Sequence, residues 1–372
     1  MTKYNLVAPC VFGIEGILGD ELRRLGFENV NAENGRVLFS GDANTIAKAN
    51  ICSRFAERIL INLGSFKAES FTELFDGVKK LPLEEFISKN DAFPVKGWSI
   101  NSKLFSIPDC QSIIKKAAVE RLKTVYKTDW FSETGPIHQL QFSIMKDNVT
   151  LMLDTSGEGL HKRGYRANSN AAPIKETLAA AMCDIARIYP DTQIYDPFCG
   201  SGTILIEAAM MAKKMAPGLR RSFAAERFDF IDQAVWKEER GAAIDRILPD
   251  VEFRACGFDI DPEAVKLTLN NAEKAGVGKY VSAEVKDVRN FKLPEGRTLV
   301  ITNPPYGERL LEIKEAEELY KVMGSVFQKS EGKKYYVISP HDEFESFFSR
   351  TADKKRKLYN GMIKCNLNMY FK

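Results

Sequence analysis

The stretch Asp196–Thr203, with the sequence Asp-Pro-Phe-Cys-Gly-Ser-Gly-Thr, constrains the fold of this 372-residue chain more than any other. An apolar run precedes it and a helix-like run, Ile204–Ala209, follows it, which is the pattern of a strand, a glycine-rich turn and a helix. Gly200 and Gly202 allow the backbone to turn sharply and to approach a ligand, because neither carries a Cβ. The pattern predicts an α/β fold with a small-molecule site at the carboxyl end of a strand.

The residues of this turn also limit the ligand. A dinucleotide fingerprint requires a third small residue where this chain has Leu205, and a Walker loop requires a lysine before Thr203. The acidic Asp196 favours a ligand with positive charge or hydrogen-bond donors. S-adenosylmethionine carries both, in its ammonium and sulfonium groups, so the turn predicts this cofactor. An ordinary tight turn is the alternative for this motif taken alone.

A second motif, Asn303-Pro304-Pro305-Tyr306, follows the run Thr298–Thr302, which is typical of a buried parallel strand. The prolines lack an N–H and fix φ, so their carbonyls and the Asn303 side chain project as acceptors. An exocyclic amine of a nucleobase is a donor that needs such acceptors, and Tyr306 offers a flat face for stacking an extruded base. Asn303, Pro304 and Tyr306 are therefore the candidate catalytic residues, and a Pro-Pro turn that caps a strand is the alternative.

Together the two motifs resemble those of class I S-adenosylmethionine-dependent methyltransferases that act on amino groups of nucleic-acid bases. The stretches Gly159–Arg166 and Ala172–Glu176 narrow this resemblance to the THUMP-containing RNA methyltransferases. Within them, the chain is similar to the guanine-N2 methyltransferase half of the bacterial 23S rRNA large-subunit enzyme. The resemblance implies a Rossmann-like methyltransferase domain with a seven-stranded sheet, preceded by a ferredoxin-like α+β unit and a THUMP domain.

The order of the expected elements divides the chain into three units. A chain of this length exceeds one typical core, and a strand–helix–strand–helix pattern in the first 60 or so residues predicts a small ferredoxin-like unit. The pattern restarts at Ile59, and the resemblance assigns the second unit to a THUMP RNA-binding domain. The expected boundaries are 1–58 for the first unit, 59–155 for the THUMP domain, 156–172 for a linker and 173–372 for the methyltransferase domain.

Three local patterns in the carboxyl-terminal half predict particular elements. Pro173 is expected at the first position of a helix that continues to Ile188. Residues 216 to about 250 are too long for a simple connection and predict an insertion. The pair Asn360-Gly361 predicts a hairpin, and the basic run Lys354–Lys357 before it is expected to be a solvated edge, with RNA contact as the alternative.

Further cofactor contacts are expected at the ends of two other strands. Asp259 follows the run Val251–Phe258, and its carboxylate can accept from both ribose hydroxyls, whereas Asp261 is expected to cap the next helix. The resemblance places Asp287 at the adenine amino group, with a surface aspartate as the alternative. The expected cofactor-binding residues are Asp196, Phe198, Gly200, Gly202, Thr203, Asp259, Ile260 and Asp287.

The net charge of +3 is too small to indicate nucleic-acid binding, so that inference depends on local clusters. Basic residues gather on the expected helix Ser112–Lys127 and in the expected linker, where a solvated helix face and a charged linker are the alternatives. The resemblance implies that they contact phosphates, which position RNA without reading its sequence. The candidate RNA-binding residues are Lys115, Lys116, Arg121, Lys123, Lys162, Arg163 and Arg166.

The remaining composition excludes several classes of protein. The seven cysteines are widely spaced without a Cys-x-x-Cys pair and the three histidines are scattered, so we expect neither a disulfide framework nor a metal site. No apolar run approaches the roughly 18 residues of a membrane span, and the amino terminus does not start a signal-peptide pattern. These features predict a cytoplasmic protein.

The sequence thus predicts methyl transfer from S-adenosylmethionine to an exocyclic amine of an RNA base, with guanine N2 of large-subunit rRNA favoured. Adenine N6 fits the same second motif, and a tRNA guanine is another possible target, so both stay open. Carbon-5 methylation of pyrimidines needs a cysteine nucleophile, and none lies beside Asn303; Cys199 is expected to pack. An RNA-binding protein with an inactive transferase domain is the alternative from a different class, disfavoured by the intact motifs.

Overall fold

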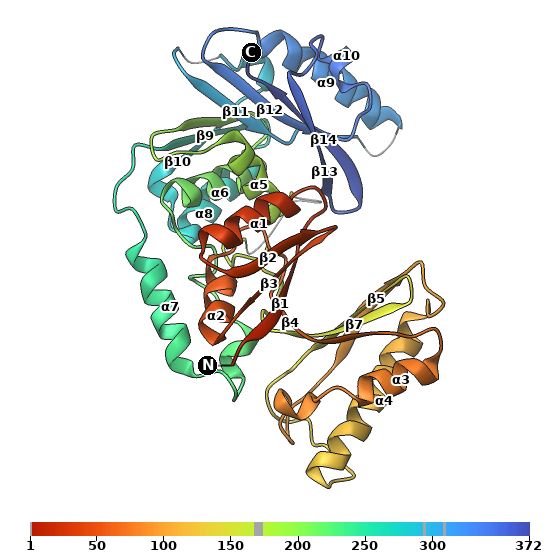
Figure 1. Cartoon of the computed structure of the whole chain (residues 1–372). Helices are drawn as coiled ribbons and strands as arrows, with labels where there is room; N and C mark the ends of the chain where they lie inside the picture. The colour runs from red at the N-terminus through yellow and green to blue at the C-terminus, as the bar shows by residue number, and fades with distance from the viewer. Residues whose placement is uncertain (1, 167–173, 293–294, 308–309) are drawn as a thin grey trace.

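The computed structural model describes residues 2–166, 174–292, 295–307 and 310–372. It contains two seven-stranded sheets, with strand orders β2-β3-β1-β4-β7-β6-β5 and β10-β9-β8-β11-β12-β14-β13. The first sheet runs through both amino-terminal units, and the second forms the centre of the carboxyl-terminal domain. Figure 1 shows that the first unit lies between that domain and the second unit.

The amino-terminal unit has a ferredoxin-like arrangement. Its elements are β1 (Tyr4–Pro9), α1 (Glu15–Arg24), β2 (Glu28–Glu33), β3 (Arg36–Gly41) and α2 (Ala43–Cys52). Asp42 caps the start of α2, since its side chain accepts from Thr45 N at 3.0 Å. Strand β2 was not predicted, because its polar and largely exposed residues have no apolar alternation.

Strand β4 (Leu60–Lys67) is shared by the two amino-terminal units. Its first residues pair with β1, in the register Leu6↔Ile61, which makes β4 the fourth strand of the ferredoxin-like sheet. Its whole length pairs with β7 (Asn148–Asp154), with a bulge between Asn62 and Gly64. The predicted boundary at residues 58/59 assigns β4 to the second unit alone, whereas the strand also belongs to the ferredoxin-like unit.

The second unit packs two helices on one face of its strands (Figure 1). Its other elements are α3 (Phe71–Lys79), the 3₁₀ turn η1 (Leu83–Glu85), β5 (Val95–Ile100), α4 (Ile107–Tyr126) and β6 (Leu140–Met145). Strands β5 and β6 run parallel, while β6 and β7 form an antiparallel hairpin. Helix α4 begins at Ile107, earlier than the predicted Ser112, because Pro108 is accommodated in its first turn.

The carboxyl-terminal domain is a parallel sheet closed by one antiparallel hairpin. Its helices are α5 (Glu176–Ala186), α6 (Thr203–Ala212), α7 (Gln233–Asp245), α8 (Pro262–Ala275), α9 (Leu310–Val326) and α10 (Phe344–Phe347). Its strands are β8 (Gln193–Asp196), β9 (Arg254–Asp259), β10 (Val281–Val285), β11 (Thr298–Thr302), β12 (Lys333–Ser339), β13 (Lys354–Asn360) and β14 (Ile363–Tyr370). Short 3₁₀ turns occur at η2 (Ala224–Arg227), η3 (Gly278–Tyr280) and η4 (Val288–Asn290).

The strand order places a ligand site at one point of this sheet. From β8 the chain moves outward to β9 and β10, and it then returns to β11 on the other side of β8. The carboxyl ends of β8 and β11 therefore flank a topological switch point, where open α/β sheets bind ligands. Helix α5 beside it begins at Glu176 rather than at the predicted Pro173, and Pro173 itself lies outside the described residues.

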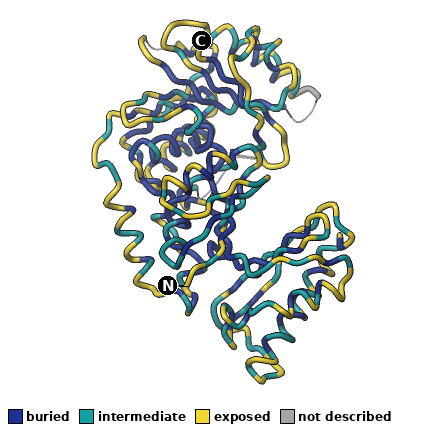
Figure 2. Tube along the Cα trace, viewed as in Figure 1, coloured by how far each residue is buried: buried dark blue, intermediate teal, exposed yellow. Residues whose placement is uncertain are grey.

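The predicted insertion at residues 216–250 holds the first unit against the carboxyl-terminal domain. Its helix α7 lies beside α2 (Figure 1), and Arg246 donates to the sulfur of Cys52 at 3.0 Å. Trp236 is buried and stacks on Phe223, with ring centroids 5.5 Å apart. One continuous core joins these two parts, whereas the second unit has its own core (Figure 2). Within the described residues, no helix has both the length and the apolar character needed to cross a membrane.

Candidate active site

A cavity of about 510 Å³ opens at the carboxyl ends of β8, β9 and β11. It is lined by all three candidate catalytic residues and by every predicted cofactor-binding residue except Gly202. The lining residues from these predictions are Asp196, Phe198, Gly200, Thr203, Asp259, Ile260, Asp287, Asn303, Pro304 and Tyr306. Two motifs separated by about a hundred residues in the sequence therefore share one cavity.

Asp196 lies at the base of this cavity with 1% of its surface exposed. Its Oδ1 atom accepts from the Phe198 N–H at 3.1 Å and from the Thr302 hydroxyl at 2.6 Å. Burial raises the pKa of Asp196 to about 7, although these two hydrogen bonds act in the opposite direction. A bound cation would stabilise the charged form of this buried carboxyl group and so lower its pKa again.

Thr302 is a site residue that the sequence analysis missed. It is the last residue of β11, is fully buried, and connects the strand before Asn303 to Asp196. The only sequence signal for it is its place directly before the Asn303 motif.

The two glycines of the turn have different environments. Gly200 has φ of 53° and lines the cavity, and a Cβ built on it meets nothing within 4 Å, so its missing side chain leaves space for a ligand. Gly202 has φ of 79°, and a Cβ there would lie 2.8 Å from Cγ2 of Thr268 on α8. Gly202 thus allows close packing of the turn on α8. It was predicted to bind the cofactor, but it does not line the cavity.

Asp259 and Asp287 both hold local backbone groups while facing the cavity. Asp259 accepts from the N–H of Gly200 and from that of Asp261, each at 3.0 Å, which fixes the end of β9 against the glycine turn. Asp261 caps α8 as predicted, since it accepts from Glu263 N at 2.9 Å. The Arg289 N–H helps to hold the pKa of Asp287 below its usual value. Each carboxylate keeps lone pairs available for a ligand.

Asn303 and Tyr306 form a hydrogen bond across the second motif. The Tyr306 hydroxyl donates to Oδ1 of Asn303, the acceptor that the sequence analysis assigned to the substrate amine. Tyr306 is half-buried, and burial, with a smaller effect from Cys365, raises its pKa, so the hydroxyl is a permanent donor at neutral pH. The predicted mode of base binding requires this hydrogen bond to open.

Most candidate RNA-binding residues of α4 are paired with acidic groups. Lys115 is 2.6 Å from Glu133, Arg121 donates to both oxygens of Glu84, and Lys123 is 3.6 Å from Glu120. Lys116 is exposed and has no ion pair within the described part of the chain. Lys162, in the segment after the second unit, is exposed and lies 2.7 Å from Glu158.

Two residues of the predicted linker do not fit their predicted contact with RNA. Arg163 has 1% of its side chain exposed, and it donates to the carbonyls of Leu160 and Arg54 at 2.6 and 2.5 Å. Arg166 donates to the Thr203 hydroxyl at 2.6 Å and lies 3.4 Å from Glu176. The prediction is wrong for Arg163, because a buried guanidinium cannot reach a phosphate. Arg166 instead holds Thr203, which is the first residue of α6 and the last residue of the turn Asp196–Thr203, called the cofactor turn below.

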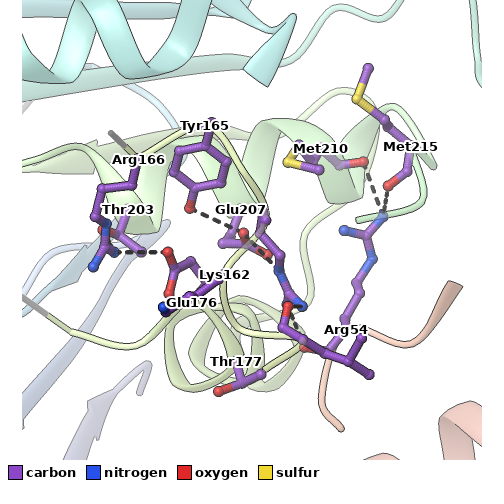
Figure 3. Close-up of polar contacts among 12 residues, drawn as sticks. Arg54, Lys162, Tyr165, Arg166, Glu176, Thr177, Thr203, Glu207, Met210 and Met215 are labelled. Atoms are coloured by element: carbon purple, nitrogen blue, oxygen red, sulfur yellow. Dashed lines mark hydrogen bonds and ion pairs between the residues drawn. The ribbon is translucent and has the colours of Figure 1, made fainter. Parts of the chain in front are cut away.

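These contacts belong to a buried polar network between the first unit and α6 (Figure 3). Glu207, fully buried on α6, accepts from Tyr165 at 3.2 Å and from Arg163 at 3.4 Å. Arg54, which follows α2, donates to the carbonyl of Met210 at 3.2 Å and to that of Met215. The network ties the ferredoxin-like unit to the helix that begins at the cofactor turn, and no local sequence pattern distinguishes its buried arginines from exposed ones.

Comparison with known families finds three domain models that match successive parts of the chain. A model described as the RMKL-like methyltransferase domain matches residues 163–369. The chain belongs to the RMKL-like methyltransferase family. Models of the RlmL ferredoxin-like domain and of the THUMP domain match residues 5–60 and 68–154. The predicted family and the predicted order of the three folds are therefore confirmed.

Two relatives align with nearly all of the chain. "Putative RNA methyltransferase YpsC" of Bacillus subtilis is 42% identical over 373 residues, which covers 100% of this chain and 97% of that protein. "Ribosomal RNA large subunit methyltransferase K/L" of Psychromonas ingrahamii is 33% identical over 375 residues, which covers 97% of this chain but 49% of that protein. The present chain thus spans about half the length of the second relative.

A solved structure supports the cofactor assignment. The structure of SMU.472, described as a putative methyltransferase complexed with SAH, is 40% identical and superposes with a TM-score of 0.94, covering 100% of this chain and 98% of that one. The present chain is therefore an RNA methyltransferase that uses S-adenosylmethionine, and the predicted cofactor is confirmed.

Proposed function

We propose that this protein methylates the N2 amine of a guanine in large-subunit ribosomal RNA. The observation that carries the proposal is the hydrogen bond from Thr302 to Asp196. It holds the Asn303 motif beside the cofactor turn, so that an amine held by one motif faces a methyl donor held by the other. The rRNA target is supported by the name of the relative from Psychromonas ingrahamii.

In this proposal, the residues of the cavity hold S-adenosylmethionine at three points. Asp196 lies under the turn and favours a cationic ligand, Asp259 accepts from the ribose hydroxyls, and Asp287 accepts from the adenine amine. Gly200 leaves room for the ligand backbone, because the space where its Cβ would stand is open. The cofactor supplies an electrophilic methyl group on a sulfonium.

The second motif holds and orients the attacking amine. The side-chain oxygen of Asn303 and the carbonyl of Pro304 accept the two N–H groups, which draws the nitrogen lone pair out of conjugation with the ring. Positioning with the nitrogen roughly 3 Å from the methyl carbon and in line with the breaking bond supplies much of the rate enhancement. A C–N bond forms as the C–S bond breaks, the sulfonium becomes a thioether, and the proton passes to water, because neutral Asn303 is not a useful base.

RNA docking in this proposal uses the THUMP domain and the surface around the cavity. Lys116 and Lys162 are the exposed members of the predicted set, and Lys115, Arg121 and Lys123 can contact phosphates only in competition with their acidic partners. Such contacts would provide affinity that depends on salt and is independent of sequence.

The proposal is tested on RNA from a strain that lacks this protein. Purified protein and S-adenosylmethionine with a tritiated methyl group are incubated with separated large-subunit rRNA, small-subunit rRNA and tRNA, and the nucleosides are identified by mass spectrometry. The proposal predicts N2-methylguanosine in large-subunit rRNA. Label found only in N6-methyladenosine, or only in tRNA, would replace it with one of the two alternative targets.

A further inference from the structure

The hairpin β13–β14 carries exposed groups that the proposed reaction has not used. Asn360 pairs with Ile363, so Gly361 and Met362 form a two-residue turn, one position later than the Asn-Gly signal predicts. The hairpin extends from the edge of the methyltransferase sheet toward the ferredoxin-like unit (Figure 1). Its turn is exposed (Figure 2).

The two faces of this hairpin differ in chemistry, because side chains alternate along a strand. One face carries the buried Leu358 and Cys365 and ends in Asn360 and Ile363, both of which line the cavity that contains Asn303. The hairpin therefore forms one wall of the substrate cavity.

The other face carries the exposed lysines Lys357 and Lys364, and in the strand register Lys364 pairs with Tyr359 and Lys357 pairs with Asn366. Neither lysine has an ion pair among the described residues. The sequence favoured a solvated edge for Lys354–Lys357, but the position of Lys357 beside the cavity wall favours the alternative, a contact with RNA.

Met362 stands at the tip, where these two faces meet. Its exposed fraction is 96%, which is the highest of any large hydrophobic side chain in the described structure. Ile363 beside it is 42% exposed although it also lines the cavity. Met362 and Ile363 thus form a small exposed apolar surface next to the cavity, and a methionine side chain adapts easily to an irregular surface.

The ferredoxin-like unit contacts the hairpin through residues of both of its faces. Arg356 donates to the carbonyl of Gly13 at 2.9 Å, and the Phe12 ring packs edge-on against Tyr359 with centroids 5.9 Å apart. Gly13 approaches so closely that an added Cβ would lie 2.4 Å from the carbonyl oxygen of Lys357. The tip is thus presented on a supported hairpin.

From this arrangement we infer that Met362 enters the base stack next to the target nucleotide, while Lys357 and Lys364 contact the flanking phosphates. The inference rests on the proposed function, because an amine can reach Asn303 only when its base leaves the stack. The extruded base leaves a gap, and nucleic-acid-binding proteins fill such gaps with apolar side chains, methionine included. Met362 is then a wedge, which here means a positioning residue that fills the gap in the stack and so favours the extruded state of the target base.

The experiment compares rate and affinity on the RNA that the wild-type protein methylates, with large-subunit rRNA from the deletion strain as the first probe. Met362→Ala is expected to lower the single-turnover methylation rate at saturating RNA about tenfold, since the cost of unstacking is no longer offset. The dissociation constants for RNA and for S-adenosylmethionine should stay within about twofold of wild type, and Met362→Leu should restore most of the rate. Ile244→Ala, an exposed residue of α7, is the matched control and should change nothing.

The outcomes separate this inference from the proposed function. A Met362→Ala rate equal to wild type, or a rate loss that saturating RNA fully reverses, overturns the wedge. A wild-type protein that binds S-adenosylmethionine but methylates no RNA refutes the proposed function, and the wedge with it. If the wild type modifies a different RNA, the rRNA assignment fails and the same comparison tests the wedge on that RNA.

The lysines are tested through the salt dependence of RNA binding. The double variant Lys357→Gln, Lys364→Gln should reduce the slope of log K against log salt by about two, because two phosphate contacts are lost. The double variant Lys237→Gln, Lys274→Gln, which removes two exposed lysines of α7 and α8, should keep the wild-type slope. An unchanged slope in the first variant contradicts the phosphate contacts.

Discussion

The hydroxyl of Thr302 donates a hydrogen bond of 2.6 Å to the carboxylate of Asp196, across neighbouring strands that are far apart in the sequence. Both residues are buried at the point where the strand order reverses. One carboxyl group thereby supports the cofactor turn and is itself fixed by the strand that presents Asn303. A change in either residue should affect both halves of the site.

Thr302→Val should weaken S-adenosylmethionine binding by roughly tenfold, because a buried acceptor of Asp196 loses a donor worth about 1–1.5 kcal/mol. Titration calorimetry measures the change. Thr124→Val, on the outer surface of α4, is the control and should bind the cofactor as wild type does. An unchanged affinity in Thr302→Val would mean that the hydrogen bond does not shape the cofactor site.

The raised pKa of Asp196 predicts a particular pH dependence of stability. Burial raises this pKa from 3.8 to about 7, so the folded protein binds more protons than the unfolded chain between these values. The contribution of Asp196 to the free energy of unfolding is therefore largest below about pH 4 and is lost as the pH rises through 7, with a slope of up to about 1.4 kcal/mol per pH unit. Asp196→Asn removes this contribution. The difference between the two proteins in free energy of unfolding, measured with urea, should therefore depend on pH between about 4 and 7. A difference that is constant with pH contradicts the raised pKa.

Substitution of the two turn glycines should separate binding from stability. Gly202→Ala forces a Cβ to within 2.8 Å of Thr268 at a positive φ, and should destabilise the fold by about 1–3 kcal/mol. Gly200→Ala meets no protein atom, so it should cost only about 1 kcal/mol of stability while its methyl group blocks the cofactor. Urea unfolding and calorimetry on both variants test this contrast. If the two variants lose the same cofactor affinity and have the same stability, the contrast is contradicted.

Arg163 and Lys162 are adjacent basic residues for which we predict opposite consequences of substitution. Arg163→Met should destabilise the protein by about 3–5 kcal/mol, because Glu207 would be left buried without its charged partner. Lys162→Met removes an exposed ion pair and should change stability by less than about 1 kcal/mol. If RNA affinity falls in Arg163→Met while its unfolding curve matches wild type, the buried role assigned to Arg163 is incorrect.

The THUMP domain can be removed without cutting the shared strand. Lys67 and Asn148 are paired at the end of the β4–β7 ladder, so residues 68–147 can be replaced by an Asn-Gly turn that keeps the hairpin. Val149→Thr and Leu151→Thr would accompany the deletion, because those side chains lose the helices that cover them. The shortened protein should bind S-adenosylmethionine normally, whereas its RNA affinity and the salt dependence of that affinity should fall.

Filter binding over a range of salt concentrations measures this loss of RNA affinity. Unchanged affinity and slope would place the RNA contacts elsewhere. Deletion of residues 1–155, in contrast, should unfold the protein, because the ferredoxin-like unit and the methyltransferase domain share one core.

Short stretches of the sequence specify the local chemistry of the site. A strand, a glycine turn and a helix are specified by neighbouring residues, and parallel strands end at the same edge of a sheet, so Asp196 and Asn303 could be placed together before any coordinates. Asp261 was predicted as a helix cap for the same reason, since a cap depends on residues within one turn.

Which groups are buried, and which elements two units share, depends on tertiary packing. Lys162 and Arg163 have the same charge and adjacent positions, but one faces water and the other faces Glu207, because burial depends on how α6 packs against the first unit. The double use of β4, the packing role of Gly202 and the place of Met362 next to the cavity-lining Ile363 likewise depend on contacts between distant segments. Burial and pairing of this kind are properties of the whole packed chain, and no short stretch of residues encodes them.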